Sequence, residues 1–343
     1  MGWLRYLYRK ATTPDNWDRD GQPHTHLDEL TGEPMLSCHR FDLVDSSYAV
    51  ALMSDQTPAW REVHSRILDE LVSRHTGWWS ASDWLTQFGD DPDRGNYPDR
   101  YKRLIPEGLW GDYNVPGWTA NGIEPHGVQM DPIAADGNLF YKGFFTLLIG
   151  LHRYVSGDDK WNKSFQMIRD GGNSFTWSHS KIAQFLAGQW NNSQVGCHCE
   201  NTKVWPTCLS AAGLGLRLYD QIFEERTHAA FDKWWEYAKE NYVKWDAGRA
   251  TNADLYYDPV VDRHVASPIG LIAPAWYLGP QRPEMGEAAW EMLLAGTNVL
   301  SGELPEIWKE PGNLTFLLQL AGEHAHPDIK YKIWDLSLIH ISE

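Results

Sequence analysis

Three of the four cysteines of this 343-residue chain, Cys197, Cys199 and Cys208, lie close together in the sequence. Glu200 follows the second of them, and Pro206 stands two positions before the third. Because proline is favoured at the first position of a helix, we expect a helix to begin at Pro206, with Cys208 in its first turn. The positive end of that helix would lower the pKa of the Cys208 thiol and make it a better proton donor and nucleophile. The segment therefore predicts two thiols and one carboxyl group that share a pocket.

Two other interpretations of the cysteine cluster stay open. Buried cysteine is a common small core residue, so the thiols could serve packing alone. Cys197, His198 and Cys199 are also zinc-ligand types, but their spacing is not the paired Cys-x2-Cys of structural zinc, and no second matching pair exists. We therefore expect no metal and no cofactor.

The balance of charges argues against several classes of partner. Lys and Arg number 30 against 46 Asp and Glu, a formal net charge of −16, and such a field repels nucleic acid and anionic lipid. No stretch approaches the ~18 consecutive apolar residues of a membrane helix, and residues 1–15 lack the apolar region of a signal peptide. We expect no nucleic-acid partner, no membrane insertion and a cytoplasmic location.

Helical periodicity dominates the readable pattern. Apolar residues recur at helical spacing over residues 138–155, and Gly157 then ends the segment. Long Gly/Pro/Asn-rich stretches at 90–127 and 247–268 are candidate binding loops, with room for short strands but not for a sheet core. Further helices are predicted at 40–53, 58–74, 158–168, 208–223, 227–242 and 284–297.

Consecutive antiparallel helix pairs in one domain of this size are typical of a helical solenoid or of a closed α/α toroid. A solenoid shows sequence repeats, which are absent here, so the toroid is favoured. The centre of a toroid forms a deep concave site.

Two motifs resemble the linalool dehydratase/isomerase family. One is the step from Cys199 to Cys208 with eight residues between them, and the other is the segment 138–143 before the apolar helix. The likeness covers roughly residues 36–278. It implies an all-α fold, a single-domain (α/α)6 barrel.

On this basis the chain divides into three parts. Residues 1–35 are expected to form an N-terminal arm, and residues 36–335 the catalytic barrel. Residues 336–343 look like translated adapter sequence and are expected to be a non-native tail.

The resemblance also assigns catalytic roles. Cys199 and Cys208 match the family's paired thiols, and Glu200 matches the carboxylate beside the first thiol. Asp42 and Tyr48 resemble the acid/base pair near the N-terminus. An alternative for Asp42 is a solvated position on a helix surface.

Five aromatic residues are candidates for the substrate pocket. Trp205 matches an aromatic wall of the family site, whereas Phe140 and Phe144 stand where the family has Met and His. The loop residues Tyr256 and Tyr257 are candidates to close over the pocket, although a simple turn before Pro259 is the favoured explanation. Phenylalanines four residues apart are also common in plain helix cores.

These features predict a cofactor-independent hydro-lyase and isomerase that acts on a small apolar alkenol or terpenoid alcohol. The resemblance further implies a homo-oligomer with active sites at subunit contacts. One alternative is a carbohydrate-active toroid enzyme, because tryptophans and acids at 78–84 and 110–118 resemble a sugar site. Another is a family member that binds terpenoids without turnover.

The absence of metal-type spacing leads to a first prediction. Exhaustive dialysis against EDTA is expected to leave the turnover of an alkenol unchanged, because the sequence offers no zinc-type ligand spacing. Gas chromatography before and after dialysis, with metal analysis of the same samples, checks this. One equivalent of zinc that is lost together with the activity would contradict it.

Overall fold

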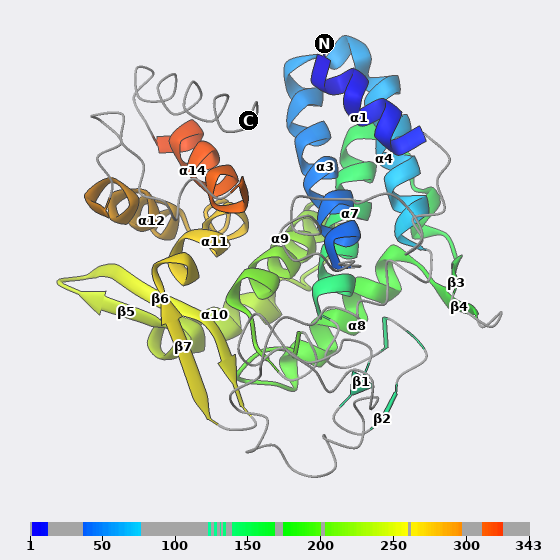
Figure 1. The fold of residues 1–343 in the computed structure, drawn as a ribbon. Helices are drawn as coiled ribbons and strands as arrows, with labels where there is room; N and C mark the ends of the chain where they lie inside the picture. The colour runs from blue at the N-terminus through cyan, green and yellow to red at the C-terminus, as the bar shows by residue number, and fades with distance from the viewer. Residues whose placement is uncertain are drawn as a thin grey trace, which may run out of the picture.

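The chain is mostly helical in the computed structural model (Figure 1). The structure describes residues 2–12, 37–76, 123–124, 127–128, 131, 133–134, 139–168, 174–199, 203–259, 262–296 and 311–324. The helices in this part of the chain are α1 (Gly2–Thr12), α3 (Ser37–Gln56), α4 (Arg61–His75), α7 (Leu139–Ser156), α8 (His179–Asn191), α9 (Pro206–Phe223), α10 (Ala229–Asn241), α11 (Pro268–Leu278), α12 (Pro283–Gly296) and α14 (Pro311–His324), with 3-10 turns η1 (Pro58–Trp60) and η4 (Lys160–Asn162).

Helices α7 and α9 form the centre of the core and pack more closely than ordinary side chains permit. A Cβ atom on Gly143 would lie 2.8 Å from the Cβ of Ala212, and one on Gly215 would lie 2.8 Å from the backbone nitrogen of Leu147. The contacts advance together along both helices, so α7 and α9 run parallel. The chain between them contains η4, two short strands and α8. Their N-terminal ends therefore lie at the same end of the core.

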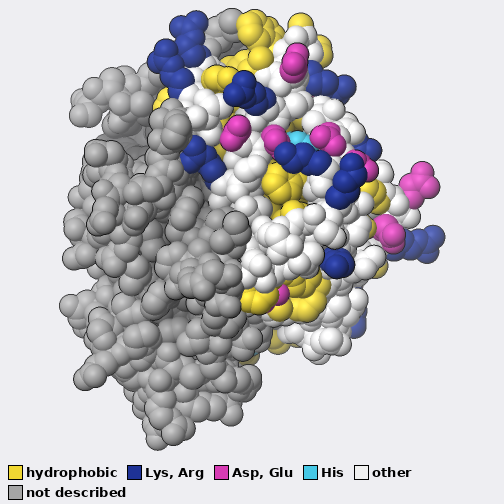
Figure 2. Space-filling model, turned by 90° about the vertical axis from the view of Figure 1, so that its right-hand side faces the viewer, with side chains coloured by type: hydrophobic (Ala, Val, Ile, Leu, Met, Phe, Trp, Pro, Cys, Tyr) yellow, Lys and Arg dark blue, Asp and Glu magenta, His cyan; other side chains and the backbone are white. Residues whose placement is uncertain are grey.

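The other helices surround this pair. Helices α3 and α4 pack on α7, and α1 packs on α4. On the other side, α11 packs on α9 and is itself covered by α12 and α14 (Figure 1). None of the described helices is long and apolar enough to cross a membrane. On the described part of the face shown in Figure 2, basic and acidic side chains are interspersed rather than gathered into one acidic patch.

The prediction of an all-α (α/α)6 barrel is wrong, because antiparallel sheets are part of the fold. The largest is a three-stranded sheet in the order β5 (Val243–Asp246), β6 (Arg249–Asp258) and β7 (Arg263–Ser267). Two separate two-stranded hairpins are also present: β1 (Ile123–Glu124) pairs with β2 (Gly127–Val128), and β3 (Phe165–Ile168) pairs with β4 (Ser174–Trp177).

The prediction of a binding loop with room for short strands at 247–268 overlooks a tight turn between β5 and β6. Ala247 and Gly248 both have positive φ, 47° and 80°, and connect Asp246 to its partner Arg249. Two consecutive residues with positive φ are the geometry of a tight hairpin. A bulge between Asp254 and Tyr256 then interrupts the alternation along β6, which hides the strand in the sequence pattern.

The prediction of a helix at 158–168 is also wrong. Only residues 160–162 are helical, as η4, and Phe165 already pairs with Trp177 in the β3–β4 hairpin. The other predicted helices are confirmed within a few residues at each end, with 58–74 divided between η1 and α4. The expected arm at 1–35 contains α1, and the expected tail at 336–343 lies outside the described residues. The predicted domain boundaries stay predictions.

The close approach of α7 and α9 predicts the effect of a single methyl group. Gly215→Ala is expected to lower the free energy of unfolding by ~1–3 kcal/mol, because the new methyl group would collide with the backbone of α7. Urea unfolding followed by circular dichroism measures this. Gly188→Ala is the matched control: nothing lies within 4 Å of that position in α8, so alanine should stabilise by about 0.5–1 kcal/mol. Equal effects of the two variants would contradict the close packing.

Candidate active site

The sulfur atoms of Cys199 and Cys208 lie 3.4 Å apart, within hydrogen-bonding distance for thiols. Both residues are buried, and neither forms a disulfide bond. Helix α9 begins at Pro206 and carries Cys208 in its first turn, as the sequence predicted. The two predicted catalytic thiols therefore share one buried place in the core.

Hydrogen bonds to Lys203 and to the start of α7 fix the position of Cys199. Its N–H donates to the carbonyl oxygen of Lys203 at 2.6 Å, and the preceding carbonyl oxygen, of His198, accepts from the N–H of Leu139 at 3.1 Å. The N–H of Phe140 donates to the Cys199 sulfur at 3.1 Å. Leu139 and Phe140 are the first residues of α7. The first N–H groups of α7, which have no acceptor within the helix, thus donate to the thiol segment.

The N-terminal ends of α7 and α9 therefore meet at the sulfur pair. Each end carries a partial positive charge from the aligned peptide dipoles. An N–H donor to a sulfur also favours the negative form of that sulfur over the neutral one. The arrangement can hold one proton between two sulfurs and stabilise the negative charge that remains.

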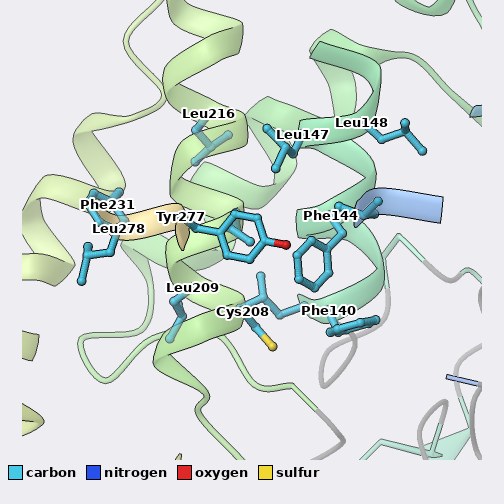
Figure 3. Packing of buried hydrophobic residues seen from close by; sticks show 14 of the residues in the cluster. Phe140, Phe144, Leu147, Leu148, Cys208, Leu209, Leu216, Phe231, Tyr277 and Leu278 are labelled. Atoms are coloured by element: carbon cyan, nitrogen blue, oxygen red, sulfur yellow. The ribbon is translucent and has the colours of Figure 1, made fainter. Parts of the chain in front are cut away.

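Aromatic rings pack beside the pair. The ring centroids of Phe140 and Phe144 lie 4.5 Å apart, and that of Tyr277, from α11, lies 5.5 Å from Phe144. Figure 3 shows these rings with Cys208 in the space between α7 and α9. All three rings are buried. The surroundings of the thiols are apolar.

Sequence reasoning missed Tyr277. Its hydroxyl donates to Oδ1 of Asp45 at 3.2 Å. Burial raises the pKa of Tyr277 well above its ordinary value, and the negative charge of Asp45 and the nearby Tyr48 and Cys208 raise it further. The phenol therefore stays neutral and acts as a hydrogen-bonding group. The only signal in the sequence was a tyrosine in an apolar helix, which does not distinguish a site residue from core.

Tyr48 lies next to Tyr277, with ring centroids 6.3 Å apart. Burial raises the pKa of Tyr48 to about 12, and the charge of Glu323 adds to this. The residue also lines a groove of about 300 Å³ at the surface between α3, α7 and α9. The structure thus brings Tyr48 to the aromatic cluster, beside Tyr277.

The remaining aromatic candidates divide into two groups. The rings of Trp205 and Tyr256 lie 4.9 Å apart and are both buried. Tyr257, the next residue on β6, points to the opposite face, where its hydroxyl donates to Asp262 and its ring lies 4.4 Å from His264. Tyr256 therefore accompanies Trp205 beside the thiol segment, and Tyr257 does not.

Several predicted residues cannot be placed. Glu200 lies outside the described residues, and so do the tryptophans and acids of the possible sugar site at 78–84 and 110–118. Asp42 belongs to α3, but its side chain lies outside the described part. Within the described ranges, no group of three or more His, Cys, Asp or Glu side chains is arranged to hold a metal ion.

A comparison with protein families identifies the family of the chain. The model of the linalool dehydratase/isomerase family matches residues 108–310, which is more than half of the chain. The matched range contains α7, the thiol segment, α9 and α11. This chain belongs to the linalool dehydratase/isomerase family.

Proposed function

We propose that the protein is a cofactor-independent alkenol dehydratase and isomerase that uses Cys199 and Cys208 as its acid and base. The observation that carries the proposal is the 3.4 Å contact between the two buried sulfurs, at the meeting point of two helix N-termini. Family membership supports the reaction class. The residues that carry it out and the substrate are our inference.

Removing water from an alkenol requires three things. An acid protonates the leaving hydroxyl group, a base takes a proton from carbon, and a dry pocket tolerates the positive charge that develops in the allylic system. The aromatic faces of Phe140 and Phe144 favour that charge through their ring quadrupoles. The thiol pair supplies the acid and the base.

The contacts at the helix ends suggest which sulfur is the base and which is the proton donor. Cys199, whose sulfur accepts the N–H of Phe140, is the thiolate base, and Cys208 is the proton donor. Cys208 protonates the hydroxyl group, the C–O bond breaks and water leaves. The Cys199 thiolate then takes a proton from carbon, and the new double bond forms. One proton crosses from Cys199 to Cys208 and restores the pair. Isomerisation results if water instead adds to the other end of the allylic cation before carbon loses its proton, and the extra proton of that water then passes to the Cys208 thiolate.

The other polar groups orient the substrate in this proposal. Neutral Tyr277 forms a hydrogen bond with the substrate hydroxyl group, and its contact with Asp45 holds the phenol in place. Asp42, Tyr48 and Glu200 keep the acid/base roles predicted from the family resemblance. A homo-oligomer with active sites at subunit contacts also remains part of the proposal.

Phe144 points to the kind of substrate. It stands where the family resemblance places a histidine, and it packs against Phe140 and Tyr277 with about 2% of its surface exposed. An apolar ring cannot bond to a hydroxyl group. We therefore propose a substrate with more apolar bulk than linalool, or with its hydroxyl group at a different position.

A panel of alkenols and glycans, assayed with and without a thiol-blocking reagent, tests the proposed function. Alkenol turnover that the reagent abolishes is the expected result. Glycan turnover that resists the reagent would instead favour a carbohydrate-active enzyme. Tight terpenoid binding without turnover would favour a binding protein.

The thiol pair predicts a specific pattern among cysteine variants. Cys199→Ala and Cys208→Ala are each expected to lower kcat by ~10²- to 10⁴-fold, the usual contribution of an acid or base. Cys197→Ala is the matched control, since Cys197 is also buried and forms no disulfide bond but is not part of the contact between the two sulfurs. Losses below about fivefold for both site variants would refute the assigned roles.

Phe144→His is expected to raise linalool turnover. A buried hydroxyl group without a partner costs ~1–3 kcal/mol, so a rise of about tenfold is expected if the imidazole reaches it. Gas chromatography of myrcene and geraniol from parent and variant measures this. Phe145→His is the control, because Phe145 stacks on His75 on another face of α7. A parent that prefers linalool, together with a variant that only loses activity, would mean that Phe144 does not occupy the family's histidine position.

A further inference from the structure

Lys203 and Asp258 form an ion pair whose two side chains are fully buried. The Lys203 Nζ lies 2.8 Å from Oδ2 of Asp258, and both side chains have 0% exposure. Removing two charges from water is costly, and such a pair rarely stabilises a fold more than two apolar side chains would. Its value more often lies in selecting one arrangement among several.

The arrangement in question is the pairing of the thiol segment with the end of β6. Val204 and Tyr257 exchange two backbone hydrogen bonds, of 2.8 and 2.9 Å, in an antiparallel bridge. In antiparallel pairing, the residue before Val204 faces the residue after Tyr257, which sets Lys203 opposite Asp258. By the same rule Trp205 faces Tyr256, and their rings are in contact.

A slip of one residue would disrupt this arrangement. Side chains alternate between the two faces of a strand, so the slip would leave Lys203 and Asp258 buried on opposite faces without each other. The backbone hydrogen bonds alone do not discriminate, because they form equally well in either register. Of the contacts across this bridge, the ion pair carries the largest penalty for a wrong register.

The register also sets the position of the first thiol. The carbonyl oxygen of Lys203 accepts the N–H of Cys199 at 2.6 Å, so a shift of Lys203 moves Cys199 with it. The sulfur of Cys199 then no longer meets the N–H of Phe140 or the sulfur of Cys208.

We propose that Lys203 and Asp258 are positioning residues, whose buried ion pair selects the strand register that places Cys199 against Cys208. The importance of that placement for catalysis rests on the proposed function. The placement itself is a property of the protein that can be measured without a substrate.

The test uses the full chain and the double variant Lys203→Met/Asp258→Leu, which removes both charges but keeps apolar bulk. Diamide oxidises the thiols, and peptide mapping by mass spectrometry gives the rate of the Cys199 to Cys208 disulfide relative to disulfides with Cys197. We expect a folded variant with a melting temperature close to the parent and a relative rate about tenfold lower, as for other small misplacements of reacting groups. The exchanged pair Lys203→Asp/Asp258→Lys is expected to restore much of that rate.

Arg249→Met is the matched control, because it removes an exposed ion pair with Glu291 at the other end of β6. It should leave the relative rate unchanged. The proposal is overturned if the folded double variant forms the disulfide at the parent rate, or if it fails to fold, which would make the pair a stability element. It is also overturned if the exchanged pair does not restore the rate. A parent without alkenol turnover would refute the proposed function and leave this result intact.

Discussion

The parallel packing of α7 against α9 is the constraint on which the site depends. The axes of two packed helices usually lie 8–10 Å apart. The glycines at 143 and 215 have no side chains that would hold α7 and α9 at that distance. Because the helices are parallel, their dipoles do not cancel, and both positive ends lie at one end of the core. The chain between them can then bring Cys199 to the N–H of Phe140 and to Cys208 at the same time.

The two phenols beside the sulfur pair stay neutral. Burial raises the pKa of Tyr48 to about 12 and that of Tyr277 well above its ordinary value. Each phenol therefore keeps its proton and can donate it in a hydrogen bond. The two helix ends favour negative charge only where the sulfurs lie, so the apolar walls and the charged centre have separate roles.

The sequence predicted those parts of the site whose signals are local. Pro206 predicted the start of α9, and the apolar residues at helical spacing before Gly157 predicted α7. Tyr277 could not be found in this way, because its role comes from a contact with Asp45, which lies 232 positions earlier in the chain. The sheet was missed for a related reason. The turn at Ala247 and Gly248 and the bulge before Tyr256 break the alternation that identifies strands. An apolar helical pattern could not distinguish a purely helical barrel from helices joined by a sheet.

The origin of the site residues along the chain has a consequence for how such enzymes diverge. The sulfurs and both phenylalanines come from one segment of about seventy residues, 139–208, whereas Tyr277 arrives from a separate helix, α11. Under the proposed function, the acid/base pair and the hydrogen-bonding partner of the substrate hydroxyl group are thus encoded in different stretches of the gene. Exchanges confined to the α11 stretch could then change which hydroxyl position is accepted while the two thiols are inherited unchanged.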